Sequence, residues 1–300
     1  MIKFYLDLGS STVKVYKFED NLLELVSEKS IYLKNGFSAE QGFSESNVKE
    51  LLDFLRTEKD KRDFKVSNTF LFATGIYREL GGEAREKLVE TIAEQTGLFL
   101  NIISHGLENY YFGEAMIGDY NNLKTLMVNM GGKTTELITF ENNKITKREN
   151  VKIGVASIMN AFPGQIENIS SAKYDDMLEF AKGILRDVKF DKGYQVGIFT
   201  GGELRLHKIV GSDLEENNLF NDGIHFEKVS MQNFDKFNRK ITHEMTMEEL
   251  YGRLPSNPKW MDGARAGAAL GQAIFELANI DTIIPSDLNL INGVIKDTNK

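Results

Sequence analysis

The stretch "DLGSSTVKVYKFEDN" at residues 7–21 decides the fold, because the chain repeats it as "NMGGKTTELITFENN" at residues 129–143. The offset is a constant 122 residues, the distance from position 7 to position 129. Apolar residues alternate on both sides of a glycine turn, which is the pattern of two antiparallel strands joined as a hairpin. Identical residues meet at Gly9 and Gly131, Thr12 and Thr134, Phe18 and Phe140, Glu19 and Glu141, and Asn21 and Asn143. The sequence therefore predicts the same hairpin twice.

Each hairpin opens a similar series of elements. After the first hairpin, a third strand is followed by alternating amphipathic helices and apolar strands, and the series restarts at Leu123. Hairpin strands followed by alternating helix and strand predict an α/β domain. We therefore expect two similar α/β domains, residues 1–122 and 123–300. Residues 211–245 are polar without clear periodicity, and we expect a loop or an insertion there.

Composition narrows the class of protein. The 300 residues are 41% hydrophobic and 27% charged, which suits two ordinary globular domains. A net charge of −8 argues against general binding to nucleic acid or to an anionic membrane. The absence of cysteine excludes disulfides and thiolate metal sites. The first residues make a poor signal peptide, and the sequence has no long apolar run, so a cytoplasmic location is expected.

Both turns have the chemistry of an anion site. A tight turn between strands leaves backbone N–H groups unpaired and fixed in direction, and such concavities bind anions. Gly9, Gly131 and Gly132 allow close approach to the backbone because no Cβ intervenes. Hydroxyl donors lie beside them, at Ser10, Ser11, Thr12, Thr134 and Thr135. Two such turns facing each other across a cleft would hold a phosphate chain from both sides.

A glycine turn with serine or threonine is also common structural punctuation. Either turn taken alone favours that ordinary interpretation. The matched repeat favours the phosphate interpretation instead, because both copies begin with Asp or Asn and carry the same glycine and threonine. We therefore treat the two turns as candidate phosphate loops.

The two turns resemble the paired phosphate loops of the actin–hexokinase–Hsp70 superfamily. Within it, the chain resembles the Ppx/GppA family of exopolyphosphatases and guanosine pentaphosphate phosphatases. Further segments resemble family motifs in the same order, namely "FATGIYREL" (72–80), "IISHGLENYY" (102–111), "FTGGELRL" (199–206), "NPKWMDGARAGAAL" (257–270) and "SDLNLINGVIKD" (286–297). The resemblance covers nearly the whole chain. It implies two ribonuclease-H-like, actin-like α/β domains with an interdomain cleft.

The resemblance also implies an activity, the hydrolysis of terminal phosphoanhydride bonds in inorganic polyphosphate or guanosine pentaphosphate. It assigns Glu108 as the general base and Arg78 as a donor to phosphate oxygens. Glu136 is the second carboxylate, which positions water or metal. The implied Mg²⁺ ligands are Asp7, Asn129 and Glu136. The implied phosphate-binding residues are Gly9, Ser10, Ser11, Thr12, Gly131, Gly132, Lys133, Thr134, Gly201 and Gly202.

Several positions depart from the family pattern. Asn129 stands where the family has aspartate, Lys133 where it has glycine, and Trp260 where it has arginine. "HGL" replaces the acidic run before Glu108. One hypothesis is that the Lys133 ammonium takes over part of the work of the metal, so that dependence on Mg²⁺ is reduced. The alternative is that Lys133 points to solvent at the tip of a turn.

Two other functions stay open from the sequence. The departures suggest a catalytically degenerate protein that binds or senses polyphosphate or guanosine polyphosphates. The superfamily also includes actin-like and sugar-kinase-like proteins that use ATP, although the closing motifs favour the Ppx/GppA family. In each case the expected partner is a small phosphorylated molecule, without nucleic acid or membrane. The family resemblance also suggests a homodimer.

Overall fold

The structure is a computed structural model that describes residues 2–167 and 173–299. It divides into two compact units, Met1–Glu114 with Leu290–Lys300, and Ala115–Asn289. Within the described residues, no helix is long and apolar enough to span a membrane.

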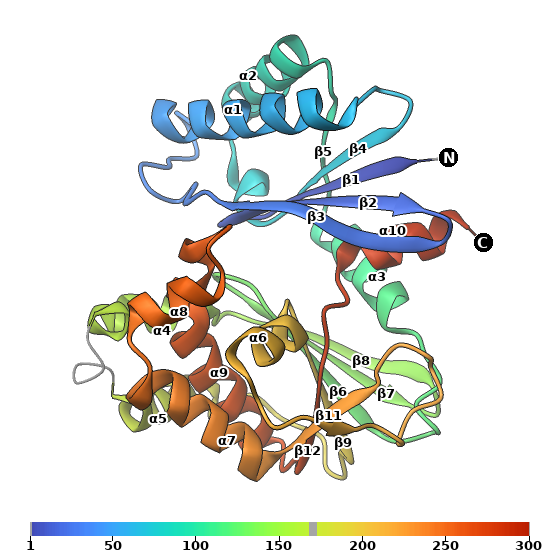
Figure 1. The fold of residues 1–300 in the computed structure, drawn as a ribbon, viewed down its shortest axis with the longest axis vertical. Coiled ribbons are helices and arrows are strands. Elements are labelled where there is room, and N and C mark those ends of the chain that lie inside the picture. The colour runs from blue at the N-terminus through green and yellow to red at the C-terminus, as the bar shows by residue number, and fades with distance from the viewer. Residues whose placement is uncertain (1, 168–172, 300) are drawn as a thin grey trace. The chain divides into compact units, whose positions relative to one another are not determined.

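The first unit contains a five-stranded sheet (Figure 1). Its strands are β1 (Lys3–Leu8), β2 (Thr12–Glu19), β3 (Leu22–Ser30), β4 (Thr69–Ala73) and β5 (Leu100–Ile102). They lie in the order β3-β2-β1-β4-β5. β2 is antiparallel to both β3 and β1, while β4 is parallel to both β1 and β5. Because β1, β4 and β5 are parallel, the segments that follow them begin at one edge of the sheet, the edge at which open α/β sheets bind ligands.

Helices cover both faces of the first sheet. They are α1 (Glu45–Arg62), α2 (Gly82–Thr96), α3 (His105–Met116), α10 (Leu290–Thr298) and the short 3-10 helix η1 (Gly75–Glu79). Alternate side chains of a strand point to opposite faces. Leu6 and Leu8 therefore join the core under α1 and α2, while Tyr5 joins the cluster under α10. Figure 1 shows α1 and α2 on one side of this sheet and α10 on the other.

The limits of the units differ from the predicted ones. The prediction divided the chain at residue 122 and placed its last residues in the second domain, whereas the structure divides it after Glu114 and returns residues 290–300 to the first unit. The physical reason is a separate apolar cluster, in which Ile291 and Val294 pack against Tyr5 and Tyr16. The face of the first sheet that carries Tyr5 and Tyr16 is apolar, and it is covered by α10.

The second unit repeats the topology of the first. Its strands are β6 (Thr125–Met130), β7 (Thr135–Glu141), β8 (Lys144–Val151), β9 (Val196–Thr200), β10 (Glu215–Glu216), β11 (Glu227–Ser230) and β12 (Thr282–Pro285). The order is β10-β11-β12-β9-β6-β7-β8. The run β8-β7-β6-β9-β12 has the same directions as β3-β2-β1-β4-β5. The predicted duplication is thus confirmed, and each unit has the ribonuclease-H-like strand order.

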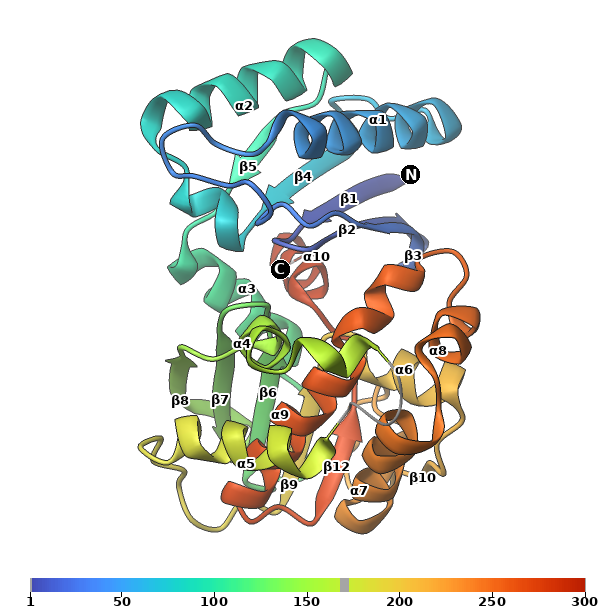
Figure 2. The ribbon, with the colours of Figure 1, turned by 90° about the vertical axis from the view of Figure 1, so that its left-hand side faces the viewer.

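The helices of the second unit are α4 (Val155–Ala161), α5 (Tyr174–Leu185), α6 (Glu203–Val210), α7 (Met231–Arg239), α8 (Met247–Arg253) and α9 (Ala264–Leu277), with 3-10 helices η2 (Pro163–Ile166) and η5 (Pro258–Gly263) and a π-helix (Lys240–Glu244). Helices α5 and α9 cover one face of the sheet (Figure 2). The prediction that residues 211–245 form a loop or an insertion is wrong in part. This segment contains β11, α7 and the π-helix, because Phe234 and Phe237 of α7 are buried.

Candidate functional site

The first hairpin turns tightly after β1. The N–H of Gly9 donates to the carbonyl oxygen of Thr12 at 3.0 Å, which closes the turn. The N–H of Ile31, after β3, donates to the carbonyl oxygen of Ser11 and ties the turn to the edge of the sheet. Across the hairpin, Asp7 lies opposite Lys14. The turn residues predicted to bind phosphate therefore lie together, with one carboxylate and one ammonium group at their base.

The second hairpin has the same turn. The N–H of Gly131 donates to the carbonyl oxygen of Thr134 at 2.8 Å, and Asn129 lies opposite Glu136. The carboxylate of Glu136 accepts three hydrogen bonds from neutral side chains, from Asn129 at 3.0 Å, Thr134 at 3.2 Å and Asn150 at 3.3 Å. These bonds fix the orientation of Glu136.

Asp7 is held in an unfavourable environment for a charge. Burial raises the pKa of Asp7 to about 6; the ammonium of Lys14 acts against this rise, and the carboxylate of Glu108 adds to it. The hydroxyl of Tyr77 is buried near Asp7 and makes no hydrogen bond within the described residues. Burial, and then the charge of Asp7, raises the pKa of Tyr77. Asp7 is partly buried, and a cation beside it would stabilise its charged form.

Arg78 and Glu108 form an ion pair. Arg78 follows β4 on η1, and Glu108 lies in the first turn of α3, which follows β5. Nη1 of Arg78 lies 2.6 Å from Oε2 of Glu108, and the two side chains are 15% and 24% exposed. His105 Nδ1 lies 3.9 Å from the same carboxylate oxygen. The structure thus brings together the arginine and the base that the sequence resemblance assigned.

Part of the guanidinium is not engaged by this pair. The Nε atom of Arg78 is buried and makes no hydrogen bond within residues 2–167 and 173–299. Buried N–H groups are usually satisfied, and an exception asks for an explanation such as a missing ion or ligand. A phosphate oxygen would satisfy this donor, because guanidinium groups bind phosphate with paired hydrogen bonds.

The Gly201–Gly202 turn lies beside the second hairpin. β9 pairs in parallel with β6, so Thr200 lies opposite Asn129, and a Cβ on Gly201 would lie 3.7 Å from Oδ1 of Asn129. Gly202 has a φ of +110°, and a Cβ there would lie 2.9 Å from the ring of Trp260. The tryptophan therefore packs directly on this turn.

Charged groups surround the beginning of α6. The guanidinium of Arg205 lies 5.5 Å from the centre of the Trp260 ring. The N–H of Arg205 donates to Oδ1 of Asp287, in the segment after β12. Burial, and then the charge of Asp287, raises the pKa of Glu203 to about 8. Sequence reasoning missed Glu203 and Asp287, although both stand inside motifs that it quoted.

The predicted site residues thus fall into one group in each unit. The first unit holds Asp7, Gly9, Ser10, Ser11, Thr12, Arg78 and Glu108, and the second holds Asn129, Gly131, Gly132, Lys133, Thr134, Glu136, Gly201 and Gly202. Lys133 is exposed at the tip of the second turn. Thr135 is fully buried, and its hydroxyl donates to the carbonyl oxygen of Ile153 at 2.7 Å, so it serves the fold rather than a ligand.

Lys14 and Asn150 are further residues of these groups that sequence reasoning missed. The signal for Lys14 was present, because the offset of 122 residues aligns it with Glu136. Asn150 carries no such signal. Its contact with Glu136 arises from the pairing of β7 with β8, in which Glu136 lies opposite Asn150.

A Ser–His–Asp arrangement occurs elsewhere in the second unit. Nδ1 of His225 lies 2.5 Å from Asp222, and Nε2 lies 2.9 Å from the hydroxyl of Ser286. This is the hydrogen-bond order of a hydrolase triad. However, Ser286 is 2% exposed and its Oγ also accepts the N–H of Leu288. We interpret this network as a clasp that holds the segment after β12.

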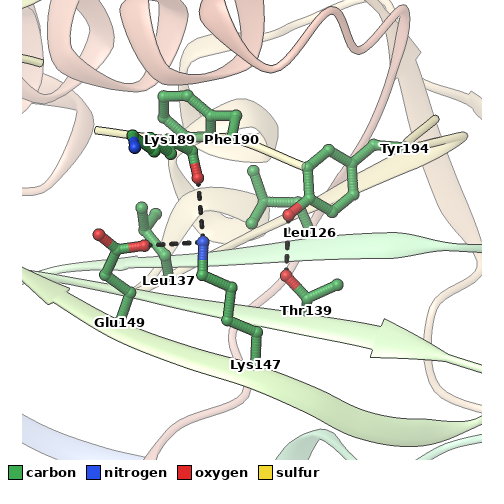
Figure 3. A pocket seen from close by; sticks show the side chains of 8 residues that line it. All are labelled: Leu126, Leu137, Thr139, Lys147, Glu149, Lys189, Phe190 and Tyr194. Carbon is green, nitrogen blue, oxygen red and sulfur yellow. Dashed lines mark hydrogen bonds and ion pairs between the residues drawn. The ribbon is translucent and has the colours of Figure 1, made fainter. Parts of the chain in front are cut away.

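A small recess in the second unit lies away from the predicted residues (Figure 3). Figure 3 shows Lys147 bridging Glu149 and the carbonyl oxygen of Lys189, while the hydroxyls of Tyr194 and Thr139 bond to each other. None of the predicted site residues lines it. These polar groups satisfy one another, so the recess offers no chemistry for a ligand.

The candidate site offers one carboxylate, that of Asp7, that could hold Mg²⁺ together with water and substrate. Within the described residues, no cluster of three or more His, Cys, Asp or Glu side chains could hold a metal ion. Mg²⁺ in phosphate sites is commonly held by one or two carboxylates, with water and substrate phosphates completing its shell. Asp7 meets that requirement, because a cation beside it would offset the cost of its buried charge.

The duplicated topology and the paired hairpins define a two-unit α/β protein of ribonuclease-H-like fold. Comparison with known families identifies the class more closely. The chain matches the Ppx/GppA phosphatase family over residues 15–300 and belongs to that family.

Solved structures agree with this assignment. The chain is similar to the Ppx/GppA enzyme of Aquifex aeolicus, with 19% identity over 99% of both chains and a TM-score of 0.66. It is also similar to an exopolyphosphatase from Cytophaga hutchinsonii, with 14% identity over 99% of this chain and 97% of the other and a TM-score of 0.71. At these identities the likeness concerns the fold. A search of curated proteins found no match.

Proposed function

We propose that this protein is a phosphoanhydride hydrolase that releases terminal phosphate from inorganic polyphosphate or guanosine pentaphosphate. The observation that carries the proposal is the Arg78–Glu108 pair next to Asp7, at the edge of the sheet where the first glycine turn begins. The second hairpin supports it with an equivalent turn and an oriented carboxylate, Glu136. The interdomain cleft expected from the sequence stays a prediction.

Hydrolysis of a phosphoanhydride requires an oriented water and neutralisation of charge on the transferred phosphoryl group. Glu108 is the proposed general base that removes the proton from water. Arg78 is the proposed donor to the phosphoryl oxygens, with its unpaired Nε available for this purpose. Since Arg78 also holds Glu108 at 2.6 Å, one residue would place both the phosphate and the base.

The turns supply the remaining donors. The N–H groups of Gly9 and Gly131 close the turns. The proposed donors to the phosphates that do not react are therefore the hydroxyls of Ser11 and Thr12 in the first unit and the N–H of Gly132 in the second. Glu136 and Asn129 are proposed to orient water or metal. Mg²⁺, when bound beside Asp7, would supply positive charge to the phosphate oxygens.

Lys133 bears on metal dependence. Lys133 is exposed at the tip of the second turn, and a flexible lysine side chain at such a place can reach a bound anion. The amide of Asn129 attracts a metal ion less strongly than a carboxylate would. We propose that the ammonium group of Lys133 supplies part of the positive charge that is then missing. Dependence on Mg²⁺ would then be reduced without being lost.

The names of similar structures suggest which substrate to propose. One similar structure is called an exopolyphosphatase, and another a Ppx/GppA enzyme. We propose inorganic polyphosphate as the first substrate to test. The second candidate function, a binder or sensor without catalysis, is favoured by one observation, the amide of Asn129 in place of a metal-binding carboxylate.

Phosphate release from polyphosphate, guanosine pentaphosphate and ATP, each with and without Mg²⁺, tests the proposal. Glu108→Gln should lower kcat by about 100-fold or more, because it removes the base. Glu83→Gln is the matched control, since Glu83 is an exposed glutamate in the first turn of another helix, α2. Tight binding of polyphosphate without phosphate release would instead establish the binder. Release unaffected by Glu108→Gln would contradict the proposed mechanism.

A further inference from the structure

The hydroxyl of Ser10 ties the first turn to a distant segment. Its Oγ accepts the backbone N–H of Ile76 at 3.0 Å, across 66 residues of sequence. The bond joins the turn after β1 to η1, which follows β4, and Arg78 lies on η1. A side chain of the candidate phosphate loop is therefore bonded to the segment that carries the arginine.

The backbone of η1 is shaped for this bond. Gly75 has a φ of +61°, a conformation that glycine adopts without strain, and a Cβ at this position would collide with Oγ of Ser10. Ile76 is 1% exposed, so its N–H has little access to water as an alternative partner. Loss of the Ser10 oxygen would leave a buried donor without compensation. Glycine at 75 and serine at 10 thus act as a matched pair.

The same hydroxyl can also donate. Because its oxygen accepts from Ile76, its hydrogen remains available to an anion in the turn. A hydroxyl that donates to an anion becomes a better acceptor, since hydrogen bonds in a chain polarise one another. An anion at the turn would therefore strengthen the bond from Ile76 and hold η1 more firmly.

We propose that Ser10 is a positioning residue that couples binding of a phosphate group at the first turn to the placement of Arg78 beside Glu108. This inference rests on the proposed function and adds to Ser10 a role beyond contact with phosphate. The second hairpin has Gly132 at the equivalent position, which offers no side chain for such a bond. The coupling therefore belongs to the first hairpin.

Amide hydrogen exchange tests the coupling without reference to catalysis. Exchange of the Ile76 N–H is measured by NMR with and without methylenediphosphonate, a non-hydrolysable pyrophosphate analogue, whose binding is followed by calorimetry. In the wild type, the analogue should slow exchange about tenfold. In Ser10→Ala, exchange should be faster without analogue and change less than about twofold when it binds. Ser11→Ala, which removes the neighbouring hydroxyl proposed to contact phosphate, should bind the analogue more weakly but show the wild-type change in Ile76 exchange once the analogue is saturating.

Steady-state kinetics provide a second readout. Ser10→Ala should lower kcat about 10- to 100-fold with little change in KM, because it disturbs the placement of Arg78 in the transition state. Ser11→Ala should chiefly raise KM. Ser10→Thr keeps a hydroxyl and should restore kcat to within about threefold of the wild type. A residue that merely stabilised the turn would not separate kcat from KM in this way.

Two results would overturn the inference. One is binding of the analogue with the same change in Ile76 exchange in the wild type and in Ser10→Ala. The other is a common kinetic effect of Ser10→Ala and Ser11→Ala. Failure of the proposed function has a different signature, in which the wild type neither binds the analogue nor releases phosphate, and the coupling then falls with it.

Discussion

The two hairpins share a backbone but differ in the charges that they carry. Each closes its turn with the same hydrogen bond, Gly9 to Thr12 in one and Gly131 to Thr134 in the other. At the base of the turn, the pair Asp7–Lys14 of the first hairpin corresponds to Asn129–Glu136 of the second. The acid lies on β1 in the first hairpin and on β7 in the second, and the residue opposite it is a lysine in the first and an asparagine in the second.

This difference separates two kinds of carboxylate. Asp7 is a carboxylate whose pKa is raised by burial, so its charged form is costly in the absence of a cation. Glu136 accepts hydrogen bonds from three neutral side chains and is held in one orientation. The duplicated scaffold therefore carries an acid with a raised pKa in one copy and an acid held by hydrogen bonds in the other. Functional residues are often retained at a cost in stability, and the proposed role of Asp7 would be an example.

Asp7→Asn should give the largest effect, in opposite directions for activity and stability. Phosphate release should fall at least about 100-fold, because the proposed metal ligand is lost. The free energy of unfolding at pH 7 should rise by about 1–3 kcal/mol, because the buried charge is removed. Activity and denaturant unfolding measured on the same preparation test both effects.

The stability gain of Asp7→Asn should depend on pH. The folded pKa of about 6 lies above the unfolded value of 3.8, so the wild type loses stability as pH rises through this window. The difference between variant and wild type should be small below pH 4 and complete above pH 6. A difference that is constant from pH 4 to pH 8 would show that the charge of Asp7 is not costly.

Asn129→Asp gives the second hairpin the acid of the first and should have an intermediate effect. A new carboxylate about 3 Å from Glu136 replaces a hydrogen bond with repulsion. We expect about 1–3 kcal/mol of lost stability without metal, recovered on addition of Mg²⁺. Thermal unfolding with and without Mg²⁺ measures this change.

Asn142→Asp is the control for that experiment. It copies Asp20, the residue at the equivalent place in the first hairpin, but lies at the exposed turn that follows β7. Its stability should be insensitive to Mg²⁺. An equal response of both variants to Mg²⁺ would show that the ion does not act at the base of the second hairpin.

Lys133→Ala should have the smallest effect. Removal of an exposed ammonium group should raise KM for polyphosphate about two- to fivefold at low salt, with less effect at high salt. The concentration of Mg²⁺ needed for half-maximal activity should also rise. Lys144→Ala changes an exposed lysine at the start of β8, after the turn that follows β7, and serves as control. Activity that is lost on chelation yet unaffected by Lys133→Ala would refute the role of Lys133.

Much of this fold could be predicted from the sequence because the information is local. Alternating apolar residues and glycine turns specify hairpins, and a repeat at constant offset specifies duplicated domains. The helix α7 was missed because its apolar residues, Phe234 and Phe237, stand among polar ones and are buried only through long-range packing. The place of α10 was missed for the same reason, since Tyr5 and Ile291 lie at opposite ends of the chain.

The residues of the candidate site could be proposed from the sequence, but their contacts could not. Arg78 and Glu108 were assigned from the family resemblance, while their mutual ion pair depends on the pairing of β4 with β5. The bond from Ile76 to Ser10 carries no local signal, because it joins residues from separate strands. Such contacts follow from sheet topology, which a single sequence specifies only after the strand order is known.

The most direct test of the account is an NMR titration of the wild type with methylenediphosphonate, observed at the backbone amides. We predict saturable shifts of the N–H resonances in residues 9–12 and 131–134, the two turns proposed as anion sites. Binding detected by calorimetry, with shifts confined to residues outside both turns, would contradict it.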